Sequence, residues 1–125
     1  MATPCYIGLE HQDGYIESIY CHFDGYLSSV GLELYTNYNS LEKLEELLSN
    51  GDMSFLGKTI EDCSFYKHNG ESDTNSQQHL CIQSWLLGKK YVDYLYLFKD
   101  NKWYVGNRTN SFTELSNALG CLIED

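Results

Sequence analysis

Near its start the chain carries two β-prone segments separated by a tight-turn signal. Residues 6–11 and 15–23 are rich in β-branched and aromatic side chains, and Asp13-Gly14, a preferred two-residue hairpin turn, lies between them. This pattern predicts a β-hairpin. A hairpin so early in the chain makes a sheet the framework of the fold.

The second of these strands alternates between two kinds of side chain. Successive residues of a strand point to opposite faces of the sheet. Ile19, Cys21 and Phe23 therefore share one face, which is the candidate core face. The opposite face carries Ser18, Tyr20 and His22.

Helical spacing replaces this alternation from residue 27 onward. One side of the first predicted helix carries Leu27, Val30, Leu34 and Tyr38. Gly31 lies inside this helix, where glycine costs about 1 kcal/mol relative to alanine.

A second helix is predicted between a capping box and a glycine stop. Asn39 with Glu42 forms the capping box, and Asn50-Gly51 ends the helix. Its outer side carries Glu42, Glu45 and Glu46, which fit a solvated face. Its apolar stripe consists of Leu41, Leu44, Leu47 and Leu48.

The later part of the chain contains a polar loop and a second hairpin. Residues 71–79 are polar without periodicity and predict an exposed loop, while residues 80–87 fit either a strand or a short helix. Residues 91–98 and 102–105 predict two strands joined across Asp100-Asn101.

A final helix is predicted from the capping box Ser111 with Glu114. Its apolar face would consist of Phe112, Leu115, Ala118, Leu119 and Leu122.

These elements predict one domain over residues 1–125. Their segregated order favours an α+β class, with a mainly antiparallel sheet of about four or five strands and helices packed on one face. A hydrophobic content of 42% is sufficient for one core.

The net charge of −10 is unevenly distributed along the chain. Residues 1–62 hold eleven acidic residues and two lysines, whereas residues 63–125 hold seven acidic and six basic residues. Such a charge disfavours direct binding to nucleic acid or to an anionic membrane and speeds encounter with a basic protein. Solubility alone is the other explanation of the charge.

Localisation is predicted from what the sequence lacks. The chain has no apolar run of eighteen residues and no signal-like start, so we expect a cytosolic protein with reduced cysteines.

No motif in the sequence indicates an enzyme, a metal or a cofactor. The neighbours Cys21 and His22 leave a strand from opposite faces, which argues against a thiol–imidazole pair. A zinc site is disfavoured because its candidate ligands match no compact zinc module. Those candidates are Cys63, His68, His79 and Cys81.

The stretch from Ser18 to Tyr26 is the main candidate for binding. A strand there ends at Asp24-Gly25 before a helix start, so side chains and backbone N–H groups meet at one corner. The alternative is that Asp24 caps the helix and His22 supports the turn. The candidate ligand-binding residues are Tyr20, His22, Asp24, Gly25, Tyr26, Trp103 and Arg108.

This stretch resembles a family of small phage and prophage proteins of unassigned function. The shared features are an Ile-Tyr-Cys-His-aromatic-Asp-Gly-Tyr strand, here residues 19–26, the later Val30-Gly31, and a Gly-Asp-x-Ser-x-Leu-Gly segment, here residues 51–57. The family pattern has proline where this chain has Leu27. The resemblance implies a phage protein acting in the host cytoplasm.

By analogy with small accessory phage proteins, the resemblance suggests counter-defence without turnover. One possibility is a homo-oligomeric sponge that sequesters a nucleotide immune signal by tyrosine stacking. Its phosphates would be held by Lys89, Lys90, Lys99 or Arg108, or by backbone N–H groups at a helix start. Another is an acidic inhibitor that docks on a basic nuclease or other host immune protein. A third is a phage accessory or regulatory protein unrelated to immunity.

Overall fold

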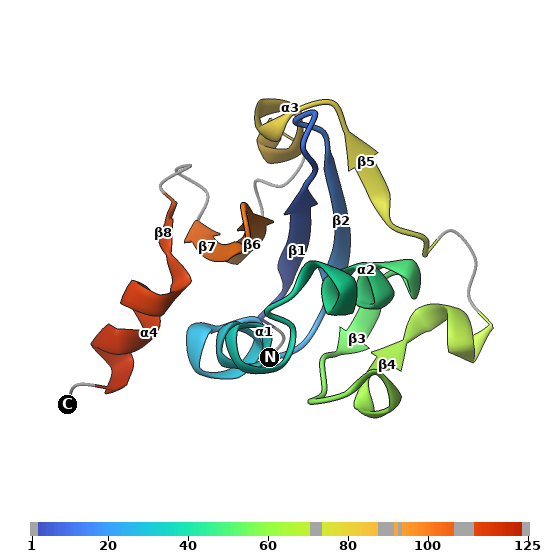
Figure 1. Ribbon diagram of the computed structural model, residues 1–125. Coiled ribbons are helices and arrows are strands. Elements are labelled where there is room, and N and C mark those ends of the chain that lie inside the picture. Colours follow the sequence, from blue (N-terminus) through green and yellow to red (C-terminus); the bar gives the residue numbers. More distant parts are fainter. Residues whose placement is uncertain (1–2, 71–73, 88–91, 93, 107–111, 124–125) are drawn as a thin grey trace.

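The fold is an eight-stranded sheet with helices on both of its faces (Figure 1). The computed structural model describes residues 3–70, 74–87, 92, 94–106 and 112–123. The strands are β1 (Cys5–Glu10), β2 (Ile16–Cys21), β3 (Met53–Phe55), β4 (Ser64–Phe65), β5 (Gln77–His79), β6 (Tyr94–Lys99), β7 (Lys102–Gly106) and β8 (Thr113–Glu114). The α-helices are α1 (Leu32–Asn37), α2 (Leu41–Ser49), α3 (Ile82–Leu87) and α4 (Leu115–Ile123), with a π-helical segment at Leu27–Gly31 and 3-10 turns at Ile60–Asp62 and Tyr66–Asn69.

Both hairpins that the sequence predicts are present. In the first, the N–H of Gly14 bonds to the carbonyl of His11 at 2.8 Å, and Gly14 has φ 92°. The loop is thus one residue longer than the two-residue turn expected from Asp13-Gly14, with glycine at its left-handed position. In the second, Asp100 and Asn101 both have positive φ, as the tight β6–β7 turn requires.

A parallel pairing between β1 and β6 joins the two hairpins. Cys5 lies opposite Tyr94, and the pairing continues to Leu9 opposite Phe98. The sheet order is β4-β3-β2-β1-β6-β7-β8, with β5 also paired to β2. The prediction of a mainly antiparallel sheet of four or five strands was therefore wrong, because the sheet is larger and mixed.

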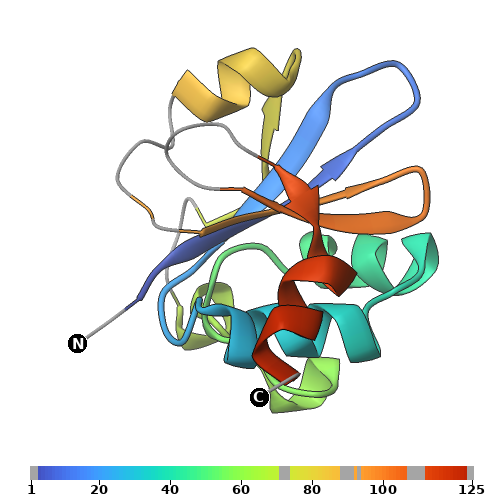
Figure 2. The same cartoon turned by 90° about the vertical axis from the view of Figure 1, so that its left-hand side faces the viewer.

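One face of the sheet holds the larger core. The π-helical segment, α1, α2 and α4 contribute to this core, and Figure 2 shows these three α-helices together on one side of the sheet. The predicted helical stripes are confirmed where they lie in this core, since Val30, Leu34 and Tyr38 are buried. Buried strand and helix residues of this core include Ile7, Leu9, Ile19, Cys21, Leu44, Leu47, Tyr96 and Leu115.

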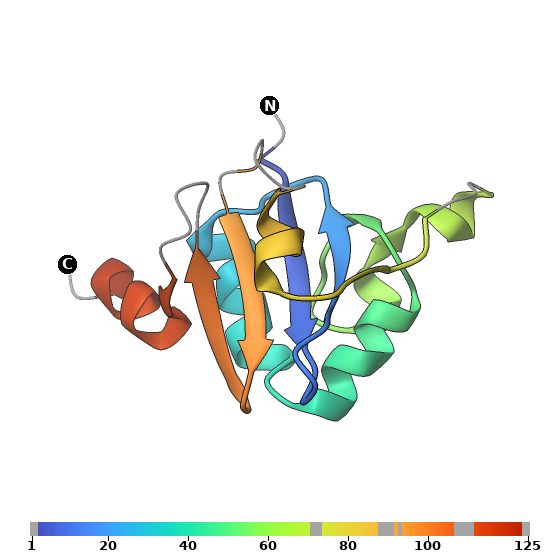
Figure 3. The same ribbon diagram turned by 90° about the horizontal axis from the view of Figure 1, so that it is seen from above.

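The opposite face holds a smaller core centred on α3, which lies over this face of the sheet in Figure 3. The buried Trp85 donates from Nε1 to Ser18 Oγ at 3.0 Å. Opposite Ser18 in the β1–β2 pairing is Gly8, where a Cβ would stand 3.0 Å from the Trp85 ring. The expectation of helices on one face only was therefore wrong. Gly8 and Ser18 leave room on the second face for the indole ring of Trp85 in α3, and we call this contact the indole seat.

Several local expectations also change. Ser40, rather than Asn39, caps α2 through its side chain, and Gly51 ends that helix with φ 83°. The expected loop at 71–79 contains β5, while residues 71–73 lie outside the described residues. Residues 82–87 form a helix, which resolves the strand-or-helix alternative.

The last helix begins later than the capping box suggested. Ser111 lies outside the described residues, Thr113 and Glu114 form β8, and α4 starts at Leu115. Phe112 instead packs on the core around Trp85. None of the helices in the described ranges is long and apolar enough to cross a bilayer.

The indole seat predicts the effect of a single added methyl group. Gly8→Ala should reduce the free energy of unfolding by about 1–3 kcal/mol, because its Cβ would press on the buried Trp85 ring. Urea unfolding followed by circular dichroism measures this loss. The control Gly120→Ala, in α4 with no atom within 4 Å of the added Cβ, should leave the protein as stable or slightly more stable. Equal stability of the two variants would contradict the packing account.

Candidate functional site

The corner at Asp24 and Gly25 is occupied by contacts that hold the fold. Gly25 donates its N–H to the carbonyl of Thr3 at 2.7 Å, and its own carbonyl accepts from the Tyr96 hydroxyl at 2.7 Å. A Cβ at Gly25 would stand 2.4 Å from the Thr3 oxygen. Asp24 has φ 60°, and its carbonyl accepts from the N–H of Val30. Backbone groups that the sequence suggested for a ligand are thus used between the chain start, the π-helical segment and β6.

Beside this corner lies an aromatic row formed by Tyr6, Tyr20, His22 and Phe23. The Tyr6 and Tyr20 rings are 5.4 Å apart, Tyr20 and His22 are 5.9 Å apart, and the His22 and Phe23 rings meet edge-on at 4.6 Å. The Tyr20 hydroxyl lies 2.7 Å from His22 Nδ1, and burial raises the pKa of this hydroxyl. Tyr20 and His22 therefore lie side by side, as strand alternation predicted. The same alternation wrongly placed Phe23 on the core face, because β2 ends at Cys21 and the Phe23 ring is 45% exposed.

The remaining candidate residues do not join Tyr20 and His22. Tyr26 is 41% exposed, whereas Trp103 is buried and donates from Nε1 to the Tyr38 carbonyl at 3.1 Å. Trp103 pairs with Phe98, at the end of β1 opposite to Tyr20. Arg108, with Lys89 and Lys90, lies outside the described residues.

The cysteines and histidines form no metal-ligand cluster in the described part of the chain. No group of three or more His, Cys, Asp or Glu side chains there is arranged to hold a metal ion. Cys63 instead accepts from the Gly57 N–H at 3.3 Å and lies 3.7 Å from the Tyr38 hydroxyl, while Cys81 is exposed before α3. Cys63 thus contributes to packing beside Gly57 and Tyr38, and the Cys81 thiol lies 3.8 Å from the Ser84 hydroxyl.

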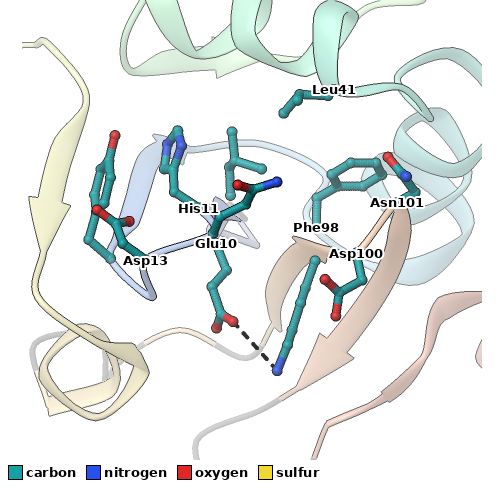
Figure 4. A pocket seen from close by; sticks show the side chains of 11 residues that line it. Glu10, His11, Asp13, Leu41, Phe98, Asp100 and Asn101 are labelled. Carbon is teal, nitrogen blue, oxygen red and sulfur yellow. Dashed lines mark ion pairs between the residues drawn. The ribbon is translucent and has the colours of Figure 1, made fainter.

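A second candidate site is an open groove at the ends of the two hairpins. It has a volume of about 700 Å³ and lies between the two turns and the start of α2 (Figure 4). Leu9 and Phe98, both buried, belong to its apolar part, together with the partly exposed Leu41. The other lining residues are Glu10, His11, Gln12, Asp13, Tyr15, Lys99, Asp100 and Asn101.

The charged rim of this groove is acidic. Glu10 is paired with Lys99 at 3.5 Å, and Figure 4 shows this pair below the hollow. Asp13 and Asp100 are exposed on the two turns. The lining therefore holds three carboxylates and one lysine, and that lysine is already engaged.

Two rings of the groove wall lie face to face, and this stacked pair, called the plate below, offers a ligand the outer face of a ring. The His11 and Tyr15 rings are stacked, 4.1 Å apart and 6° from parallel. His11 Nε2 lies 3.3 Å from Glu17 Oε1, and the Ser76 hydroxyl donates to Glu17 Oε2 at 2.8 Å. Glu17, itself bonded by Ser76, thus restrains the His11 ring of the plate. An aromatic plate with an acidic rim suits a cationic group and repels phosphate.

The sequence indicated both turns of this site but not the site itself. Asp13-Gly14 and Asp100-Asn101 were read as separate hairpin turns, and nothing in their spacing predicts that β1 and β6 run side by side. The pairing of His11 with Tyr15 across the first turn was the one local signal available. Comparison with known proteins adds no assignment, since no family model, curated protein or solved structure matches the chain.

The hydrogen bond from the Tyr96 hydroxyl to the Gly25 carbonyl predicts how substitution of Tyr96 changes stability. Tyr96→Phe leaves the Gly25 carbonyl without its buried donor and should cost about 1–3 kcal/mol in the free energy of unfolding. Tyr35→Phe, at an exposed ring, is the matched control with little expected effect.

Burial also raises the pKa of the Tyr96 and Tyr38 hydroxyls above the usual value of about 10. Folded protein therefore holds these protons more tightly than unfolded protein, so their contribution is complete below pH ~10 and is lost as pH rises further. Absorbance near 295 nm, recorded against pH, should show a group of tyrosines that ionise only as the protein unfolds. Ionisation of every tyrosine near pH 10 without unfolding would contradict this burial.

Proposed function

We propose that the protein is a non-catalytic binding protein that docks its acidic hairpin end onto a cationic surface of another macromolecule. The observation that carries this proposal is the groove rim, where Asp13 and Asp100 stand exposed beside a Glu10 already neutralised by Lys99. A surface of this sign attracts basic partners over a distance of about 10 Å at ordinary ionic strength.

Helix α2 extends the acidic surface away from the groove. Leu41, the first residue of α2, lines the groove, and the exposed side chains of Glu42, Glu45 and Glu46 follow on the same helix. Complementary charges of this kind guide encounter and orientation more than they add affinity. A partner with a basic groove or ridge fits this surface best.

The resemblance to phage proteins supplies a setting for the proposal. In that setting the partner is a basic nuclease or other host immune effector, and docking inhibits it by covering the path of its nucleic acid. No bond of the partner or substrate is cleaved by this protein. Binding in stoichiometric amounts accounts for such inhibition.

Sequestration of a nucleotide immune signal is the second candidate, and the aromatic row favours it. Rings such as Tyr20 and Phe23 offer faces on which a nucleobase stacks. The phosphates need cations, and Lys99 is held by Glu10 at the other end of β1. This candidate therefore depends on Lys89, Lys90 or Arg108 and on a homo-oligomeric site that these residues complete.

The docking proposal is tested by inhibition of basic nucleases with a fluorescent oligonucleotide substrate. Inhibition should appear at low ionic strength and weaken as salt rises. The double variant Asp13→Asn with Asp100→Asn should weaken it about tenfold, since an exposed ion pair contributes up to about 1 kcal/mol. Asparagine suits both turns, so the fold is kept.

A matched control removes two charges elsewhere. Glu61→Gln with Asp62→Asn, on the exposed 3-10 turn, should leave inhibition within about twofold of the unchanged protein. Absence of inhibition and of binding across a panel of basic nucleases at low salt would end the docking proposal.

A further inference from the structure

We propose that the groove takes one arginine side chain of the basic partner, stacked on the His11–Tyr15 plate and hydrogen-bonded to the carboxylates of the rim. This inference rests on the proposed docking function and specifies the chemical group that anchors it. Three features of the groove select arginine over other cations.

The first feature is the apolar part of the groove. Leu9 and Phe98 line the groove but are each only 2% exposed, so its open apolar surface comes mainly from Leu41, which is 45% exposed. A hydrated metal ion or a lone ammonium would leave this apolar surface uncovered. The long apolar stem of a basic side chain covers it while its charged end reaches the rim.

The second feature is the plate itself. A guanidinium is planar and weakly hydrated, so it stacks on aromatic faces, whereas the ammonium of lysine is compact and strongly hydrated. His11 and Tyr15 are held close to parallel by each other and by a backbone hydrogen bond of 2.9 Å from the His11 N–H to the Tyr15 carbonyl. Because Glu17 and Ser76 fix the plate before binding, little side-chain ordering is needed.

The third feature is the placement of the exposed carboxylates. Asp13 and Asp100 belong to different hairpin turns that line the same hollow. A guanidinium presents five N–H donors in a fixed fork and bonds a carboxylate in bidentate fashion, and Figure 4 shows one such carboxylate on each side of the hollow. Glu10, by contrast, is already paired with Lys99 and closes one side of the groove.

The test uses three fluorescent nine-residue peptides that are identical except at three central positions, which are arginine, lysine or citrulline. Fluorescence anisotropy measures their binding to the whole protein at low salt. The arginine peptide should bind at least fivefold more tightly than the lysine peptide, and the citrulline peptide, which keeps the planar shape without charge, should bind negligibly. Equal binding of the arginine and lysine peptides would overturn the inference while leaving charge-driven docking intact.

Substitutions at Tyr15 test whether the preference for the arginine peptide over the lysine peptide comes from the stacked rings. Tyr15→Leu should abolish the preference for arginine over lysine and keep the weaker, salt-sensitive binding of both peptides. Tyr15→Phe should retain the preference, because the ring is kept. Phe55→Leu, at an exposed ring on β3 outside the groove, is the control and should also retain it. Circular dichroism confirms that each variant is folded, and a preference that survives in folded Tyr15→Leu would overturn the inference.

A competition experiment tests whether the groove binds an arginine side chain of a protein or a small free cation. Free arginine and spermine, at concentrations up to a hundredfold above the arginine peptide, should displace little of it. Displacement by spermine at equimolar concentration would overturn the protein side chain as occupant and assign the groove to a polyamine. Failure of all three peptides to bind, in a protein that still inhibits basic nucleases, would place docking on α2 and overturn the arginine site alone.

Discussion

The parallel pairing of β1 with β6 is the constraint on which the rest of the structure depends. It brings residues 5–9 beside residues 94–98 and so joins two hairpins that are far apart in the sequence. Strand β1 then has a neighbour on each side, and both faces of the sheet centre must be covered. Ile7 and Leu9 meet the helices on one face, and Gly8 admits Trp85 of α3 on the other. Each face has its own core for this reason.

The same pairing creates the candidate binding groove. Because β1 and β6 run in the same direction, the turns that follow them lie at the same end of the strands. Figure 2 shows the two turns side by side. Asp13 and Asp100 thereby line one hollow, with Leu41 of α2 beside it. At the opposite end of the strands, the backbone groups of Gly25 are bonded to the Thr3 carbonyl and the Tyr96 hydroxyl. The fold thus leaves its open acidic surface at the hairpin ends.

The sequence predicted the local elements well and the arrangement poorly. Turn residues and helical spacing are local signals, so both hairpins and the stripe of Leu44, Leu47 and Leu48 could be recognised. The parallel pairing depends on contacts between residues some ninety positions apart, which leave no periodic signal. Short strands such as β5 owe their form to the strand they join, here β2, rather than to their own polar residues.

The candidate site shows the same division. Alternation correctly placed Tyr20 with His22 and separated both from Cys21, because side-chain direction is set within one strand. Trp103 could not be placed from sequence, since its ring is buried under the Tyr38 carbonyl, a contact across the core. An Asp-Gly turn before a helix is compatible with two arrangements. Its backbone N–H groups can be free to bind a ligand, or the glycine can be needed because another segment packs closely against it. Only the position of Thr3 distinguishes the two.

Under the proposed function, cationic partners bind at the hairpin ends. Backbone amide shifts in two-dimensional NMR, recorded while an arginine-rich peptide is added to the isotopically labelled protein, test it most directly. The account predicts that the largest shifts fall in residues 10–15 and 99–101 and that Leu41 also responds, with little change at Tyr20 and His22. Largest shifts at the aromatic row, with the hairpin ends unaffected, would contradict it.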